Sequence, residues 1–228
     1  MRDYTFLVGS DIHFPVHDRK AVDAFMDEAG SGYDLIVING DALDMESIST
    51  FSDGLPESLV APIKLQFLML RDFFVSLRKV APKSNIVYVL GNHEHRISRW
   101  LDRNPSMRGL VEIEDYVPDF VHVVPYESEG YRNGSVTFVH SKGGGNVHSA
   151  VKKHAVEYVT HTVIGHFHAF GSYTAPSQVG VVPRTCQAVG TLSKLNHKYM
   201  QGRPASAEQG YLTGEVKGSR VQFWPIRL

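Results

Sequence analysis

Five short segments of this 228-residue chain carry side chains of the types that bind metal ions. Their aspartates, histidines and asparagine offer oxygen and nitrogen atoms but no thiolate, a donor set suited to Mn, Fe, Zn or Ni. The segments are Asp11-Ile12-His13, Gly40-Asp41-Ala42-Leu43-Asp44, Gly91-Asn92-His93-Glu94, His140 and Gly165-His166-Phe167-His168. They lie far apart in the chain, so a metal site requires a fold that gathers them.

Each segment alone has an ordinary explanation. A Gly-Asp pair after a strand is commonly a turn, and a single histidine such as His140 is more often a hydrogen-bonded core or loop residue. His166 and His168 are more informative, because alternate residues that leave a strand point the same way. The combination favours a metal site, since every segment follows or ends an apolar, strand-like stretch.

The elements predicted in the first half of the chain would bring these segments together. Apolar runs at residues 4–10, 35–39 and 86–90 are typical of buried strands. Between them, one helical pattern begins at Asp18 and a second covers residues 59–80. Alternating strands and helices predict a parallel sheet with right-handed crossovers. In such sheets, ligand sites lie beyond the carboxyl ends of the strands.

The second half is predicted to form a mainly antiparallel sheet. Asn133-Gly134 is a hairpin turn between strand-like runs at residues 120–124 and 136–139. Helices are expected at residues 93–103 and 146–158, a strand at residues 161–164, and a hairpin from the runs at residues 210–216 and 220–226. We therefore expect a single α/β domain over residues 1–228. Its architecture would be a four-layer α/β/β/α sandwich, with two mixed β-sheets packed face to face and helices outside.

The composition narrows the classes of protein to which the chain could belong. Its 23 Lys+Arg nearly balance its 24 Asp+Glu, which gives no general attraction to nucleic acid or membrane. The single Cys186 excludes an intrachain disulfide framework and suits a reducing compartment. No apolar run approaches the roughly 20 residues needed to cross a bilayer, and no secretory signal is visible. We expect a cytoplasmic protein without membrane attachment.

A pair of metal ions close together would explain the residue types of the five segments. Two such ions need a bridging carboxylate, and Asp41 stands in the centre of the set. The pair converts a bound water to hydroxide near neutral pH and holds both ends of an in-line phosphoryl displacement. We expect two divalent ions, with Mn first among Mn, Fe, Zn and Ni.

Together the five segments resemble the complete signature of the calcineurin-like metallophosphoesterases, over residues 11 to 168. That family has a double β-sandwich flanked by helices, which agrees with the architecture predicted above. The resemblance implies two sets of four metal ligands that share one carboxylate. One ion would be held by Asp11, His13, Asp41 and His168, and the other by Asp41, Asn92, His140 and His166.

The resemblance also assigns the catalytic step. His93 would not be a ligand but the general acid and oxyanion stabiliser, oriented by Asp44. A histidine beside two cations needs such a carboxylate to remain protonated.

The chain departs from the protein phosphatase branch of the family. That branch carries Asp-Arg-Gly after its second motif and an arginine before Gly-Asn-His, where this chain has Asp44-Met45-Glu46 and Leu90. Because those arginines bind phosphate, a dedicated phosphoprotein phosphatase is disfavoured.

Other basic residues could bind the substrate instead. Arg96, Arg99 and Arg103 share a helix face, and we take Arg96 and Arg99 as candidate substrate-binding residues. The alternative is an exposed basic face without a role. The loop of Lys142-Gly143-Gly144-Gly145-Asn146 could hold phosphate through backbone N–H groups or simply form a turn.

The function favoured by these residues is hydrolysis of a phosphoester, with phosphodiesters, nucleotides or nucleic acid as the preferred substrates. The alternative is a phosphomonoesterase that acts on small molecules or phosphoproteins. A non-catalytic metal-binding scaffold is the third interpretation. It would be expected to have lost ligands or the catalytic histidine, and this chain retains them all.

Overall fold

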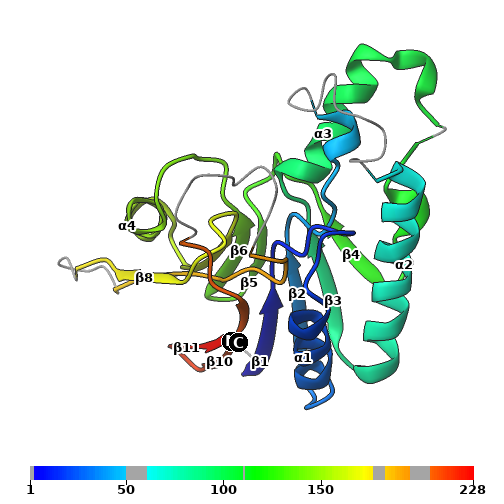
Figure 1. Ribbon diagram of the computed structural model, residues 1–228. Helices are drawn as coiled ribbons and strands as arrows, with labels where there is room; N and C mark the ends of the chain where they lie inside the picture. The colour runs from blue at the N-terminus through cyan, green and yellow to red at the C-terminus, as the bar shows by residue number, and fades with distance from the viewer. Residues whose placement is uncertain (1–2, 50–60, 110, 177–182, 196–205) are drawn as a thin grey trace.

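The computed structural model describes residues 3–49, 61–109, 111–176, 183–195 and 206–228. Two β-sheets pack face to face within these residues, and helix α4 lies on the opposite side of the molecule from α1 and α2 (Figure 1). The four-layer α/β/β/α sandwich predicted from the sequence is therefore confirmed.

The first sheet has six strands in the order β11-β10-β1-β2-β3-β4. Its parallel part consists of β1 (Tyr4–Gly9), β2 (Leu35–Asn39), β3 (Asn85–Val89) and β4 (Val121–Val124). The C-terminal hairpin of β10 (Gly210–Lys217) and β11 (Arg220–Arg227) adds antiparallel strands beside β1. The connecting helices are α1 (Arg19–Ala29), α2 (Ile63–Val80) and α3 (Asn92–Arg103), with short 3-10 turns η1 (Glu46–Ile48), η4 (Pro105–Met107) and η5 (Glu114–Tyr116).

The second sheet has five strands in the order β5-β6-β7-β9-β8. Its parallel centre is made of β6 (Val136–His140), β7 (His161–Gly165) and β9 (Thr185–Ala188). The edge strands β5 (Tyr131–Asn133) and β8 (Gly171–Thr174) are antiparallel to their neighbours. Helix α4 (Val147–Glu157) covers the outer face.

Alternation along the central strands explains why they are apolar at nearly every position. In β1, Phe6 and Val8 face the second sheet, whereas Leu7 faces the helices. In β3, Val87 likewise belongs to the layer between the sheets, and Tyr88 packs against α2 on the other side. Successive side chains of a strand point to opposite faces, so a strand covered on both faces must be apolar on both.

Two sequence expectations about strand pairing were wrong. The Asn133-Gly134 turn does not join the strand now seen as β4 to β6. It joins β6 to the short strand β5, and β4 pairs with β3 in the first sheet. The second half is also not a mainly antiparallel sheet, because β6, β7 and β9 run parallel and the C-terminal hairpin belongs to the first sheet.

The helix starts follow local chemistry. The carboxylate of Asp18 accepts hydrogen bonds from the backbone N–H groups of Lys20 and Ala21, at 2.9 and 3.1 Å, and so caps α1 as predicted. The helix predicted at residues 59–80 is observed as Ile63–Val80, and residues 59–60 lie outside the described ranges. Among the helices described, none combines the length and the apolar character required to span a bilayer.

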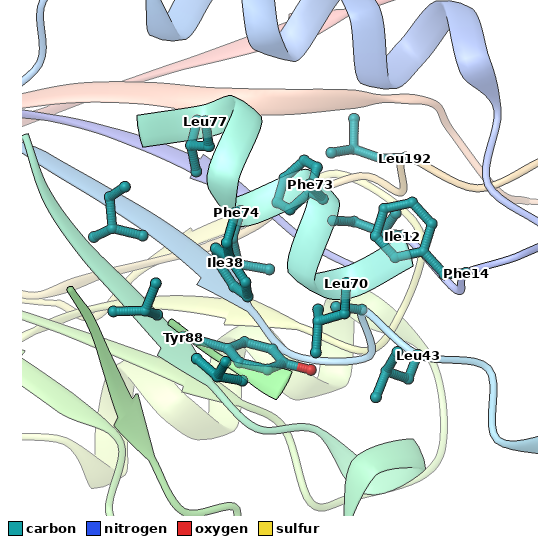
Figure 2. Close-up of a cluster of buried hydrophobic side chains, with 14 of the residues drawn as sticks. Ile12, Phe14, Ile38, Leu43, Leu70, Phe73, Phe74, Leu77, Tyr88 and Leu192 are labelled. Carbon is teal, nitrogen blue, oxygen red and sulfur yellow. The ribbon is translucent and has the colours of Figure 1, made fainter. Parts of the chain in front are cut away.

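Helix α2 allows a matched test of the core. Leu70 is fully buried against the first sheet (Figure 2), whereas Leu65 on the same helix is 45% exposed. Leu70→Ala should lower the free energy of unfolding by about 2–5 kcal/mol, through lost burial and a residual cavity. Leu65→Ala should cost about 1 kcal/mol or less, since leucine and alanine have similar helix propensity. Urea denaturation of both variants measures the difference, and equal losses would contradict this packing.

Candidate metal centre

The polar segments that follow β1, β2, β3, β6 and β7 meet at the carboxyl ends of these strands. Three groups of residues there have ligand atoms within 4.8 Å of one another. The groups are Asp11, His13 and His168; His13, Asp41 and His93; and Asp41, His140 and His166. Both sheets thus contribute, and neither alone holds the complete set.

The first group surrounds a point suited to a cation. His168 Nε2 lies 3.1 Å from Asp11 Oδ1 and 3.1 Å from His13 Nε2. The distance between His13 Nε2 and Asp11 Oδ1 is 3.9 Å. Two imidazole nitrogens at this distance can share only one proton, so at least one of them has a lone pair that a cation could use.

The third group, of Asp41, His140 and His166, gathers around Asn92. The Asn92 side-chain oxygen is 2.8 Å from His166 Nδ1 and 3.2 Å from His140 Nε2. His140 Nε2 is also 3.2 Å from Asp41 Oδ2. Asp41 belongs to two of the three groups and therefore lies between the two halves of the site.

Asn39 orients His140 and ties the sheets together. His140 Nδ1 donates to the Asn39 carbonyl oxygen at 2.8 Å, so Nε2, which faces Asp41, is the nitrogen that would bind a metal ion in exchange for its proton. The Asn39 side-chain amide donates to the carbonyls of Val139 and Val163, on β6 and β7. The sequence reasoning assigned no role to Asn39, because a buried asparagine inside a strand gives no local signal of its partner.

Glu94 is a second positioning residue that the sequence reasoning quoted without assigning a role. Its carboxylate is 2% exposed and accepts the backbone N–H groups of Asp41, Leu43 and Gly91, at 3.0, 2.8 and 2.7 Å. One side chain thus fixes the loop after β2 and the turn after β3. A glutamate three residues after the N-cap supplies one half of a capping box, in which its carboxylate accepts the N-cap N–H, and this spacing could have identified it.

Most of the predicted ligands adopt a left-handed backbone conformation. Among the described residues, six non-glycine residues have positive φ. Five of them are predicted ligands, namely Asp11 (55°), His13 (55°), Asp41 (50°), His166 (95°) and His168 (53°), and the sixth is Met45 (48°). Such conformations cost about 1–3 kcal/mol each and persist only where the surrounding structure enforces them, commonly at functional sites.

Two glycines allow the ligands to approach one another. A Cβ atom on Gly91 would overlap the carboxylate and backbone nitrogen of Asp41, and one on Gly40 would overlap the His140 ring. Gly40 also has a φ of +88°. The glycines of the Gly-Asp and Gly-Asn pairs are therefore required by close packing around the site.

The charges of the site fit bound cations. Burial disfavours the ionised form of Asp41, but the neighbouring His140 and His93 outweigh it and hold the pKa of that carboxyl well below its usual range. Burial likewise disfavours the imidazolium of His140, but Asp41 outweighs it and raises the pKa of His140 to about 10. The pKa of Asp11 is also lowered, against its burial, by His168. The carboxylates of Asp11 and Asp41 therefore both remain ionised inside the protein. Buried anions beside imidazole nitrogens form a donor set that matches divalent ions.

His93 and Asp44 lie at the edge of this set. His93 Nδ1 donates to the Asp44 backbone carbonyl at 2.5 Å, whereas the Asp44 carboxylate is 3.9 Å from the same atom. That carboxylate lies closer to His13 Nδ1, at 3.3 Å. Asp44 therefore contacts His93 chiefly through its main chain, and an orienting role for its carboxylate stays a prediction.

Arg96 lies directly beside His93. Its guanidinium donates to His93 Nε2 at 3.1 Å, to the Asp44 carbonyl at 3.0 Å and to the Glu46 carboxylate at 3.2 Å. Glu46 is a partner that the sequence reasoning missed. Arg99 lies exposed one helical turn further along α3.

Comparisons with known proteins bear on this arrangement. The family model Metallophos, described as calcineurin-like phosphoesterase, matches residues 4–170. None of the curated protein sequences matches the chain. Similar solved structures include YfcE, a phosphoesterase from E. coli, at 18% identity over 95% of this chain and 90% of that chain, with a TM-score of 0.46. Zn-complexed Vps29 from Entamoeba histolytica is 11% identical over 98% of both chains, with a TM-score of 0.48. Because both TM-scores are below 0.5, the family assignment rests on the match of the family model to residues 4–170.

Replacing Glu94 tests whether its carboxylate fixes the site. Glu94→Gln puts amide hydrogens opposite backbone donors, and a buried donor left unsatisfied costs about 1–3 kcal/mol. We expect a loss of stability of that order in urea denaturation, together with weaker metal binding measured by competition with a chelator. Glu114→Gln, at an exposed glutamate in η5, is the matched control and should behave like the wild type. Wild-type stability in Glu94→Gln would contradict the assignment.

Proposed function

The chain belongs to the calcineurin-like phosphoesterase family, and we propose that it hydrolyses phosphoesters with two divalent metal ions. The observation that carries the proposal is the convergence of three overlapping ligand groups, two of which share Asp41, at the carboxyl ends of strands from both sheets. Carboxylate, imidazole and amide donors suit Mn first, with Fe, Zn or Ni as alternatives.

Each ion would have four protein ligands. Asp11, His13, Asp41 and His168 would hold the first, and Asp41, Asn92, His140 and His166 the second. The proximity of Asp41 to both halves of the site supports its proposed role as the bridge. When bound, such a pair supplies Lewis-acid stabilisation of the reacting phosphate and a nucleophile derived from water.

We propose His93 as the general acid. The Asp44 carbonyl can only accept a hydrogen bond, so Nδ1 carries a proton and Nε2 is the atom that would protonate the leaving oxygen. Arg96 now donates to Nε2, and a nitrogen that accepts a hydrogen bond cannot carry a proton itself. His93 would therefore act as an acid only when Arg96 turns its N–H groups to a phosphate oxygen. Substrate binding and proton donation would be coupled through Arg96.

The surroundings of Arg96 support a phosphodiester as the substrate. Glu46 forms an ion pair with Arg96 at 3.2 Å, which offsets the positive charge available to the phosphate. A diester carries one negative charge at the reacting phosphate and a monoester carries up to two, so the diester needs less neutralisation and suffers less repulsion from Glu46. We propose nucleotide or nucleic-acid diesters as substrates. Arg99 would contact an extended substrate, and its effect should weaken as salt rises.

Replacing Asp41 tests the bridge. Asp41→Asn keeps the shape of the side chain but removes its charge and one of its two oxygen donors, so we expect most of both metal ions to be lost. Mass spectrometric metal analysis of Mn-loaded protein measures the occupancy, and Asp115→Asn in exposed η5 is the control. Near-normal occupancy of two ions in Asp41→Asn would overturn the bridging role.

Replacing His93 tests the function itself. The Mn-loaded wild type should hydrolyse bis(p-nitrophenyl) phosphate faster than p-nitrophenyl phosphate. His93→Ala should lower kcat on the diester about 10²–10⁴-fold with unchanged metal content, since general acid catalysis typically contributes that much. His148→Ala, at an exposed histidine on α4, should leave the rate unaltered.

Two other results would redirect this proposal. If His93→Ala lost metal in proportion to activity, His93 would be a ligand, as its proximity to His13 and Asp41 permits. If the metal-loaded wild type bound two ions but hydrolysed neither ester, the non-catalytic scaffold would become the better interpretation.

A further inference from the structure

A cavity of about 380 Å³ opens beside the metal centre, on the α4 side of the second sheet. Its walls come from residues 127–129 after β4, residues 141–144 after β6, one face of α4, and Phe167. The glycine loop predicted either to hold phosphate or to form a turn therefore borders this cavity, through Gly143 and Gly144.

The cavity lining adjoins the proposed ligands at two points of the chain. Ser141 follows His140 in the chain, and Phe167 separates His166 from His168, with its ring 5.1 Å from that of His166. The turns that present ligands to the metal centre thus present the intervening side chains to the cavity.

Contacts of Tyr126 also join the cavity lining to His140. The ammonium of Lys142, which lines the cavity, lies 5.7 Å from the centre of the Tyr126 ring. That ring is in turn 6.3 Å from the ring of His140. A group attached to a phosphate at the metals could therefore extend past Tyr126 into the cavity.

The lining favours a polar group that contains a ring and carries no charge. His154 and Tyr158 lie with their ring centres 5.3 Å apart at an angle of 34°, and Phe167 adds a third aromatic surface. Three serines are part of the same lining: the Ser128 hydroxyl donates to the Pro125 carbonyl and the Ser141 hydroxyl pairs with His154 Nε2, and Ser149 on exposed α4 adds a third hydroxyl. Planar rings stack on aromatic side chains, and the hydroxyls can bond to polar atoms at the ring edges.

The charges of the lining disfavour a second phosphate in the cavity. Its described charged residues are Lys142 and Lys153 against three glutamates, at positions 127, 129 and 157. The Lys142 ammonium donates to the carbonyls of Glu127 and Ser128, at 2.9 and 3.0 Å. An ammonium has three N–H donors, so one remains for a ligand atom such as a carbonyl oxygen.

We propose that this cavity binds the nucleoside of a nucleotide ester while the reacting phosphate lies at the metal centre. The inference rests on the proposed hydrolase function and specifies its substrate. The volume falls near the lower end of the range of about 300–1,000 Å³ for small-molecule sites. It suits one nucleoside, with further nucleotides of any longer substrate lying outside.

Two aryl esters distinguish the cavity from the metal centre. Thymidine 5′-(p-nitrophenyl phosphate) and bis(p-nitrophenyl) phosphate release the same product and differ only in the second group on the phosphate. Ser149→Trp places an indole in the cavity from the exposed face of α4. His148→Trp places the same side chain at the preceding residue, which is exposed and outside the lining.

We expect Ser149→Trp to raise KM for the thymidine ester at least about tenfold more than for the bis-aryl ester, since steric exclusion acts on the nucleoside alone. His148→Trp should match the wild type on both esters. Saturation-transfer NMR with thymidine itself, on the same three proteins, measures binding without hydrolysis. Thymidine should bind the wild type and His148→Trp but not Ser149→Trp.

The two readouts separate the two proposals. Thymidine binding lost only in Ser149→Trp, in a protein that hydrolyses neither ester, would support the cavity and refute the hydrolase. Hydrolysis of both esters with equal KM changes in Ser149→Trp would overturn the nucleoside site and leave the hydrolase standing. Thymidine binding that is absent from the wild type, or retained in Ser149→Trp, would overturn the nucleoside site as well.

Discussion

The metal centre depends first on one buried carboxylate. Glu94 accepts three backbone N–H groups from two loops, and Asp41 Oδ1 accepts a fourth, from His93, across the same two loops. Burying an ionisable group is costly, and the nearby charge of Asp41 adds to burial in raising the pKa of Glu94. The three donors offset that cost because hydrogen bonds are stronger in a low-dielectric interior. The geometry of the candidate bridging ligand is thus set by a residue that would itself bind no metal.

The backbone conformation of the predicted ligands also depends on residues that would bind no metal. Five predicted ligands have positive φ, and their strain must be offset by the rest of the fold. Two apolar layers of the first sheet provide that support: one against α1 and α2, the other against the second sheet. Asn39 connects this packing with the candidate metal centre. Its side chain joins β2 to two strands of the other sheet, and its carbonyl orients His140.

Arg96 would connect substrate binding with proton donation at His93. Its contacts with His93 and Glu46 place one cation between a candidate acid and a carboxylate. A substrate phosphate would compete with both partners for the same guanidinium. The cavity beside Tyr126 and Lys142 instead offers rings, hydroxyls and nearly balanced charge. The site is thus asymmetric, with charge near the proposed acid and neutral polar surface where the rest of a substrate would lie.

The sequence by itself determined the elements and the ligand types. Alternation and apolar runs predicted β2 at its observed bounds, Asp18 marked the start of α1, and the strand-end context of Asp11, Asp41 and His166 indicated a metal site. These features are local, so a short window contains their cause. Only the tertiary structure decided that β4 joins the first sheet, that β5 rather than β4 pairs with β6, and that the C-terminal hairpin lies beside β1. It also revealed that Asp44 meets His93 through its carbonyl and that Glu46 pairs with Arg96. Strand partners and side-chain contacts are selected by burial and hydrogen bonding between residues far apart in the chain, for which no local pattern carries a signal.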